Sequence, residues 1–117
     1  MDQSILDDIK KLLGIDSEDT SFDTDIKIHI NTTVLSLSQI GIGPLNGVII
    51  TSKDNTWHDF IGTSTINLEG VKTYIYLKTK LIFDPPTNST TIQSIENSLK
   101  ELEWRMMLAV ETNNLEE

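Results

Sequence analysis

The stretch KLIFDPPTNSTTIQSIE, residues 80–96, decides the fold of this chain because two prolines separate two long helical patterns in it. A proline disfavours the helical conformation of the residue before it, so Pro85 and Pro86 together end any helix that reaches Asp84. The pattern before the prolines therefore predicts a helix that ends near Phe83. A second helical pattern resumes within a few residues, so we expect the two helices to fold back on each other.

The second of these helices is predicted over residues 89–112. Asn88, Ser89 and Thr90 are favourable N-cap residues, and Thr90 with Gln93 has the spacing of a capping box. Apolar side chains then recur at alternating spacings of three and four residues, which is typical of a packing seam. The predicted seam consists of Ile92, Ile95, Leu99, Leu102, Met106 and Ala109.

The helix before the corner is predicted over residues 67–83, and about half of its circumference is apolar at roughly 100° per residue. This arc consists of Leu68, Val71, Tyr74, Ile75, Leu77, Leu81 and Ile82. So wide an arc is typical of a well-buried helix. The remaining face carries Tyr76 and Phe83 among lysines. The two aromatics are either ordinary surface side chains or an exposed stripe that contacts a partner.

The N-terminal part of the chain predicts a helix over residues 3–13 that is capped by Asp2 or Ser4. Its acidic residues come early and its lysines late, which complements the helix dipole, and Gly14 follows as a left-handed stop. The predicted inner face consists of Ile5, Ile9 and Leu12, with Leu6 and Leu13 beside it.

A longer helix is predicted over residues 23–40, with Asp23, Thr24 or Asp25 as its N-cap. One face consists of Ile26, Ile30, Thr33, Leu37 and Ile40. Ile28 and Leu35 lie on nearly the opposite side. A helix that is apolar on two sides is either central in the domain or in contact with a second molecule.

The middle of the chain contains the β-branched and apolar run Val48–Thr51, which predicts one short strand. Ser64–Ile66 is a weak candidate partner for it, and another chain is the alternative. Residues 55–61 predict a short helical turn capped by Asn55 or Thr56. The fold class is therefore mainly α, a compact bundle of four to five helices with at most a small β element.

The last turns of the C-terminal helix break its pattern. Trp104, Met107 and Leu108 lie on sides that are polar one or two turns earlier, so this part of the helix is apolar nearly all round. Two interpretations stay open: these side chains complete the core of their own domain, or they form a docking surface of the kind that protein interfaces favour.

Length and composition limit the function further. The 117 residues predict one domain, 1–117, with a polar tail over 111–117. Nine basic against eighteen acidic residues give a net charge of −9, which disfavours binding to nucleic acid or to an anionic membrane. The N-terminus does not have the pattern of a signal peptide, and the longest aliphatic run, Val48–Ile50, is too short to span a bilayer.

The sequence contains no motif for catalysis, and no cysteine that could form a disulfide, bind a metal or act as a nucleophile. His29 and His58 have no third group at ligand spacing, so we expect no metal and no cofactor. We also expect that the chain is not an enzyme. An unrecognised enzyme that uses a serine or a carboxylate stays open as an alternative.

Several segments, taken in order, resemble the head–tail connector proteins of long-tailed phages and prophages. The segments are TSFDTDIKIHIN (20–31), GIGP (41–44), YIYLKTKLIFDPPTNS (74–89) and IENSLKELEWRM (95–106). The resemblance extends from about residue 5 to residue 110. It is strongest at the corner Leu81–Pro86 and at Glu101–Arg105, and weakest over residues 47–66.

The resemblance implies a helical adaptor that assembles as a homo-oligomeric ring beneath the portal protein and joins the filled head to a downstream head-closure or tail protein. It implies that the ring encloses DNA without sequence-specific binding. The expected location is the head–tail junction of the virion, with assembly in the host cytoplasm. The candidate partner-binding residues are Ile28, Leu35, Tyr76, Phe83, Trp104, Met107 and Leu108. The alternative is an acidic DNA mimic or another helical protein-interaction module of a prophage.

Overall fold

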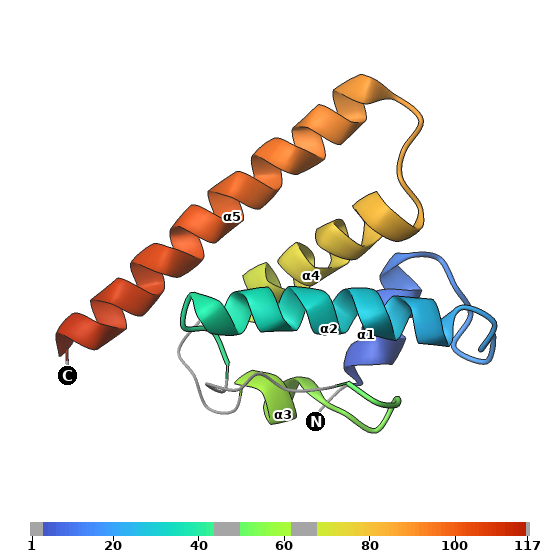
Figure 1. The fold of residues 1–117 in the computed structure, drawn as a ribbon, viewed down its shortest axis with the longest axis horizontal. Helices are drawn as coiled ribbons and strands as arrows, with labels where there is room; N and C mark the ends of the chain where they lie inside the picture. The colour runs from blue at the N-terminus through green and yellow to red at the C-terminus, as the bar shows by residue number, and fades with distance from the viewer. Residues whose placement is uncertain (1–3, 44–49, 62–67, 117) are drawn as a thin grey trace.

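The computed structural model describes residues 4–43, 50–61 and 68–116, and in these residues it is built from helices alone (Figure 1). The helices are α1 (Ile5–Leu12), α2 (Asp23–Gln39), α3 (Trp57–Ile61), α4 (Leu68–Phe83) and α5 (Ser89–Glu116). The predicted mainly α fold is confirmed.

Helices α2 and α4 form the central pair and run antiparallel (Figure 1). Phe22, just before α2, meets Phe83 at the end of α4 edge to face, with 5.3 Å between ring centroids. Helix α1 packs against both members of the pair, while α5 lies along α4. The core between them is lined by aliphatic side chains such as Ile26, Ile30 and Ile75, which are fully buried.

The proline corner is placed as predicted, because α4 ends at Phe83 and α5 begins at Ser89. Asn88 is the residue that caps α5: its Oδ1 accepts the backbone N–H groups of Thr90 at 2.7 Å and Thr91 at 3.3 Å. The predicted pairing of Thr90 with Gln93 is replaced, since the Gln93 amide donates to Asn97. The 28 residues of α5 extend about 42 Å at 1.5 Å per residue, and the helix runs diagonally across the molecule (Figure 1).

Helix α1 is capped at Ser4 as predicted, and its buried face differs from the prediction at one position. Ser4 is the N-cap, and its Oγ accepts the backbone N–H of Asp7 at 3.2 Å. Leu6 is buried with Ile5 and Ile9, whereas Leu12 is exposed, so the predicted inner face is wrong at Leu12. The reason is that α1 lies against α2 and α4 together, which rotates its buried arc toward Leu6 and leaves Leu12 at the edge.

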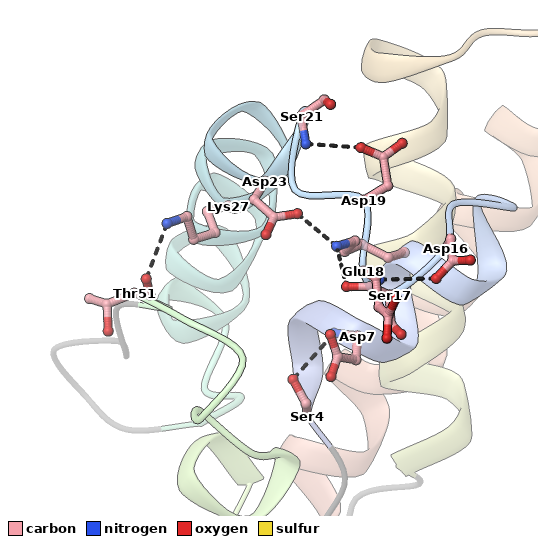
Figure 2. A network of polar contacts seen from close by, with 11 residues as sticks. Ser4, Asp7, Asp16, Ser17, Glu18, Asp19, Ser21, Asp23, Lys27 and Thr51 are labelled. Carbon is pink, nitrogen blue, oxygen red and sulfur yellow. Dashed lines mark hydrogen bonds and ion pairs between the residues drawn. The ribbon is translucent and has the colours of Figure 1, made fainter.

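The start of α2 also differs from the prediction. Phe22 occupies the N-cap position without a side-chain cap, and Asp23 is the first helical residue. The Asp23 carboxylate instead pairs with the buried Lys10 of α1, with 2.8 Å between Oδ1 and Nζ. Figure 2 shows Asp23 at the start of α2, with a dashed line from its carboxylate. Lys10 also donates to the backbone oxygen of Ser17 at 3.1 Å. Asp23 therefore lies at the predicted helix start, but its function there is to hold α1 against α2.

The described part of the predicted strand, Ile50–Thr51, is not a strand. The side chain of Asn31 in α2 takes the place of a partner strand: its Nδ2 donates to the Ile50 oxygen at 3.1 Å, and its Oδ1 accepts the Ile50 N–H at 2.6 Å. Ile50 itself is buried, which explains the apolar pattern without a sheet. Val48, Ile49 and the candidate partner Ser64–Ile66 lie outside the described residues.

Helix α3 is the predicted helical turn, and Thr56 caps it. The Thr56 hydroxyl accepts the Asp59 N–H at 3.3 Å, and the Asp59 carboxylate accepts the Thr56 N–H at 2.9 Å, which is a reciprocal capping arrangement. The indole N–H of Trp57 donates to Asp8 in α1 at 2.7 Å, and Lys72 of α4 lies 5.2 Å above the Trp57 ring. These contacts tie α3 to α1 and α4.

Candidate partner-binding surfaces

The inner side of α5 packs on the rest of the molecule along the predicted seam. Leu99 and Met106 are buried, and four neighbours along the helix are partly buried against the core. These neighbours are Ile95, Leu102, Ala109 and Val110, while Ile92 is partly buried near the start of the helix. The predicted seam is confirmed, and it accounts for one side of α5 only.

A buried tyrosine and a glycine mark where α5 lies against the rest of the molecule. Burial and the charge of Glu103 on α5 raise the pKa of Tyr74 on α4 to about 12. Further along, Gly41 has φ of +98°, and a Cβ at this position would lie 2.9 Å from a methyl carbon of Val110. The C-terminal half of α5 therefore rests directly on the backbone of the turn that follows α2.

The opposite side of α5 is an apolar strip on the protein surface. Trp104 is 62% exposed, Met107 47% and Leu108 41%. At about 100° per residue these three side chains centre on the side of the helix away from Leu99 and Met106. We call them the α5 outer stripe. The sequence left open whether Trp104, Met107 and Leu108 complete the core or form a docking surface. Their exposure shows that they do not complete the core.

The outward side of α2 carries the two apolar residues that the sequence placed opposite its buried face. Ile28 and Leu35 are each more than half exposed, on the side opposite the buried Ile30 and Leu37. We call Ile28, Thr32 and Leu35 the α2 outer face. Both members of the pair lie where the sequence placed them, and their binding to a partner stays a prediction.

Beside the α2 outer face lies a hollow of about 290 Å³ between α2 and α4. It is lined by His29, Thr32, Thr33, Ser36, Lys78 and Ile82. Ile82 is 61% exposed, so its predicted burial is wrong, although Ile75 two turns earlier on the same side is fully buried. The reason is that the α2 residues facing the last turn of α4 are polar and leave Ile82 uncovered. Thr79 is buried instead, with its hydroxyl donating to the Ile75 oxygen at 2.8 Å.

Tyr76 and Phe83 do not form one surface. Phe83 is half-buried against Phe22 at the end of the central helix pair. Tyr76 is half-buried beside a separate hollow of about 410 Å³ between α1 and α4, which the exposed Leu12 and Lys11 also line. The structure brings neither aromatic next to the α5 outer stripe, so their binding stays a prediction for two separate places.

The acidic connector between α1 and α2 is organised by its own hydrogen bonds (Figure 2). Asp16 accepts the Glu18 N–H and Asp19 accepts the Ser21 N–H, each at 3.0 Å. The Ser21 backbone and hydroxyl hold the pKa of Asp19 below its usual value. Among the described residues no group of three His, Cys, Asp or Glu side chains is placed to hold a metal ion. None of the helices in the described ranges is long and apolar enough to cross a membrane.

Comparison with known proteins gives one clear result. Neither the curated proteins nor the solved structures contain a significant match to this chain. A family model described as phage connector protein matches residues 5–113, which is nearly the whole chain and includes the corner and both sides of α5. This chain therefore belongs to the phage connector protein family.

Proposed function

We propose that this chain is the subunit of a homo-oligomeric ring that lies beneath the portal and joins the DNA-filled head to the tail. Membership of the connector family implies a structural component of the virion that contacts other head or tail proteins, and its members are generally not enzymes. The observation that carries the finer proposal is the α5 outer stripe, an exposed apolar surface on a helix whose other side already supplies the core.

The stripe has the composition of an interface rather than of ordinary surface. Trp and Met are enriched where proteins bind one another, and truncation of a central Trp often costs about 2 kcal/mol or more of binding free energy. The stripe also lies on the half of α5 whose inner side packs on the core at Met106 and approaches the backbone of Gly41 through Val110. A rigid helix that presents an apolar strip loses little conformational entropy on docking.

The net charge of −9 supports a ring through which DNA passes without being held. A protein that binds DNA neutralises phosphates with Lys and Arg, and this chain has twice as many acidic as basic residues. We propose that residues 1–117 act as one domain, that the ring contacts the portal on one side and a head-closure or tail protein on the other, and that subunits assemble in the host cytoplasm.

The test separates association from folding. Trp104→Ala and Leu108→Ala should leave the melting temperature nearly unchanged and should weaken ring or portal association, measured by native mass spectrometry and light scattering with and without the portal protein. Met106→Ala is the matched control on the buried side of the same helix, and it should lower the melting temperature. If the stripe variants unfold the protein, or if they associate as well as the wild type does, the docking function of the stripe is wrong.

A further inference from the structure

We infer that the α5 outer stripe of one copy of this chain docks on the α2 outer face of the next copy, with the two helices parallel. The inference rests on the proposed ring, and it names the two surfaces that meet at each contact between subunits. Three observations support it. Both surfaces have exposed apolar side chains, opposite charges would meet at the two ends of the contact, and a hollow lies beside the α2 outer face.

Both surfaces carry large apolar side chains that are about half exposed in the structure. Ile28 and Leu35 line the α2 outer face, and Ile82 extends it across the hollow onto α4. Ile82 occupies the side of α4 on which Ile75 is fully buried, so an apolar cover is missing there. The α5 outer stripe contains a Trp and a Met, which are the residue types that fill such shallow hollows at interfaces.

The charges that flank the two surfaces determine the orientation. On α5, Lys100 precedes the stripe and Glu111 follows it, eleven residues further along the helix. On α2, Asp25 precedes the outer face, and Ser36 lies eleven residues further on and lines the hollow together with Lys78. Because α4 runs antiparallel to α2, Lys78 lies toward the Ser36 end of the hollow and Ile82 toward the His29 end.

A parallel alignment that places Lys100 opposite Asp25 also brings Glu111 to Ser36, and so to Lys78. It sets Trp104 beside Ile28 and His29, and Met107 opposite Thr32. An antiparallel alignment would place Glu111 against Asp25 and Lys100 against Lys78, and like charges at an interface suppress binding. The charge pattern therefore favours the parallel orientation alone.

The stripe and the face are different surfaces of one subunit, so each copy can offer both at once. A contact of this kind is heterologous, and repeated copies close into a ring when the rotation between neighbours allows it. A self-complementary contact would give a dimer instead. The inferred contact is therefore of the heterologous type that the proposed ring requires.

The first test uses disulfide formation between copies, which is clean because the chain has no cysteine of its own. Met107→Cys and Thr32→Cys are mixed and oxidised under conditions in which light scattering shows association, with portal protein added if the chain alone stays monomeric. We expect at least about tenfold more linked dimer than from Met107→Cys mixed with Thr73→Cys, because a disulfide forms only when the two Cα atoms approach within about 7 Å. Thr73 is exposed on α4, on the side of the other hollow.

The second test exchanges the charges. Lys100→Glu should weaken self-association about fivefold, which is the scale of one exposed ion pair, and the double variant Lys100→Glu, Asp25→Lys should restore it. If the protein associates but the Met107–Thr32 disulfide does not form, or the double variant does not restore association, the inferred contact is wrong while the proposed ring still stands. No association with or without portal protein contradicts the proposed ring and this contact together.

Discussion

Helices α4 and α5 follow each other closely in the chain, yet their surroundings differ in kind. Helix α4 is packed by α1, α2 and α5, and it buries Val71, Tyr74, Ile75 and Thr79. Helix α5 is longer and packs through one side, so its opposite side carries the outer stripe into solvent. The difference separates two kinds of helix: α4 is packed on several sides and holds the fold together, whereas α5 packs through one side and leaves exposed the side that we propose binds a partner.

The largest expected effect tests this difference directly. Ile75→Ala removes a fully buried side chain from the centre of α4 and should lower the free energy of unfolding by about 2–5 kcal/mol. Met107→Ala removes an exposed side chain of similar size from α5 and should change it by less than about 0.5 kcal/mol. Urea denaturation of both variants gives the comparison. Equal losses would mean that the outer stripe contributes to the fold as α4 does.

A smaller loss is expected from Gly41→Ala, which tests how the C-terminal half of α5 is attached. Because Gly41 has a positive φ, an alanine there should lower the free energy of unfolding by about 1–3 kcal/mol through backbone strain. Its methyl group would also lie too close to Val110. Gly14→Ala is the matched control, because Gly14 also has a positive φ but a Cβ added there would meet nothing within 4 Å. A Gly41 variant that loses no more stability than the Gly14 variant would show that the contact with α5 is unimportant. Thermal and urea unfolding of the two variants provide the measurement.

Substitutions in the proline corner between α4 and α5 should destabilise the protein less than substitutions in the packed positions above. Pro85→Ala and Pro86→Ala each allow more conformations to the unfolded chain, which costs about 0.4–1 kcal/mol per site, and they remove the barrier to an overrun of α4. We expect a lower melting temperature for the double variant by differential scanning calorimetry. An unchanged or higher melting temperature would show that Asn88 and the seam alone determine the angle between the helices.

The smallest effect sharpens the link between the two helices. The pKa of Tyr74 is raised from 10.0 to about 12 in the folded protein, so its contribution to stability is present below pH 10 and is lost as the pH rises through 12. Tyr74→Phe removes the hydroxyl whose pKa burial and the Glu103 charge raise, and it should cost at most about 1 kcal/mol at neutral pH. Between pH 10 and pH 12, the free energy of unfolding should fall less for the Tyr74→Phe variant than for the wild type. Tyr76→Phe is the control on the same helix, and an identical pH profile for wild type and Tyr74→Phe would contradict the assignment.

The sequence by itself determined the helices and the corner, because these depend on interactions within a few residues. Proline sterics end α4 at Phe83, and the side chains of Ser4, Thr56 and Asn88 cap their own helices. The spacing of Leu99 and Met106 also predicted which side of α5 packs inward, since a helix must place such residues on one side. The exposed positions of Ile28 and Leu35 follow from the same periodicity.

Tertiary structure alone decided which apolar residues are covered and which polar residues replace local partners. Leu12 and Ile82 have the right spacing for burial, but the buried arc of α1 turns toward Leu6, and polar residues of α2 line the hollow beside Ile82. Asp23 pairs with Lys10 instead of capping α2, and Asn31 bonds Ile50 where a strand was expected. These outcomes depend on groups that are distant in the sequence, and burial of a charge or an amide requires a partner whose position only the packed helices define.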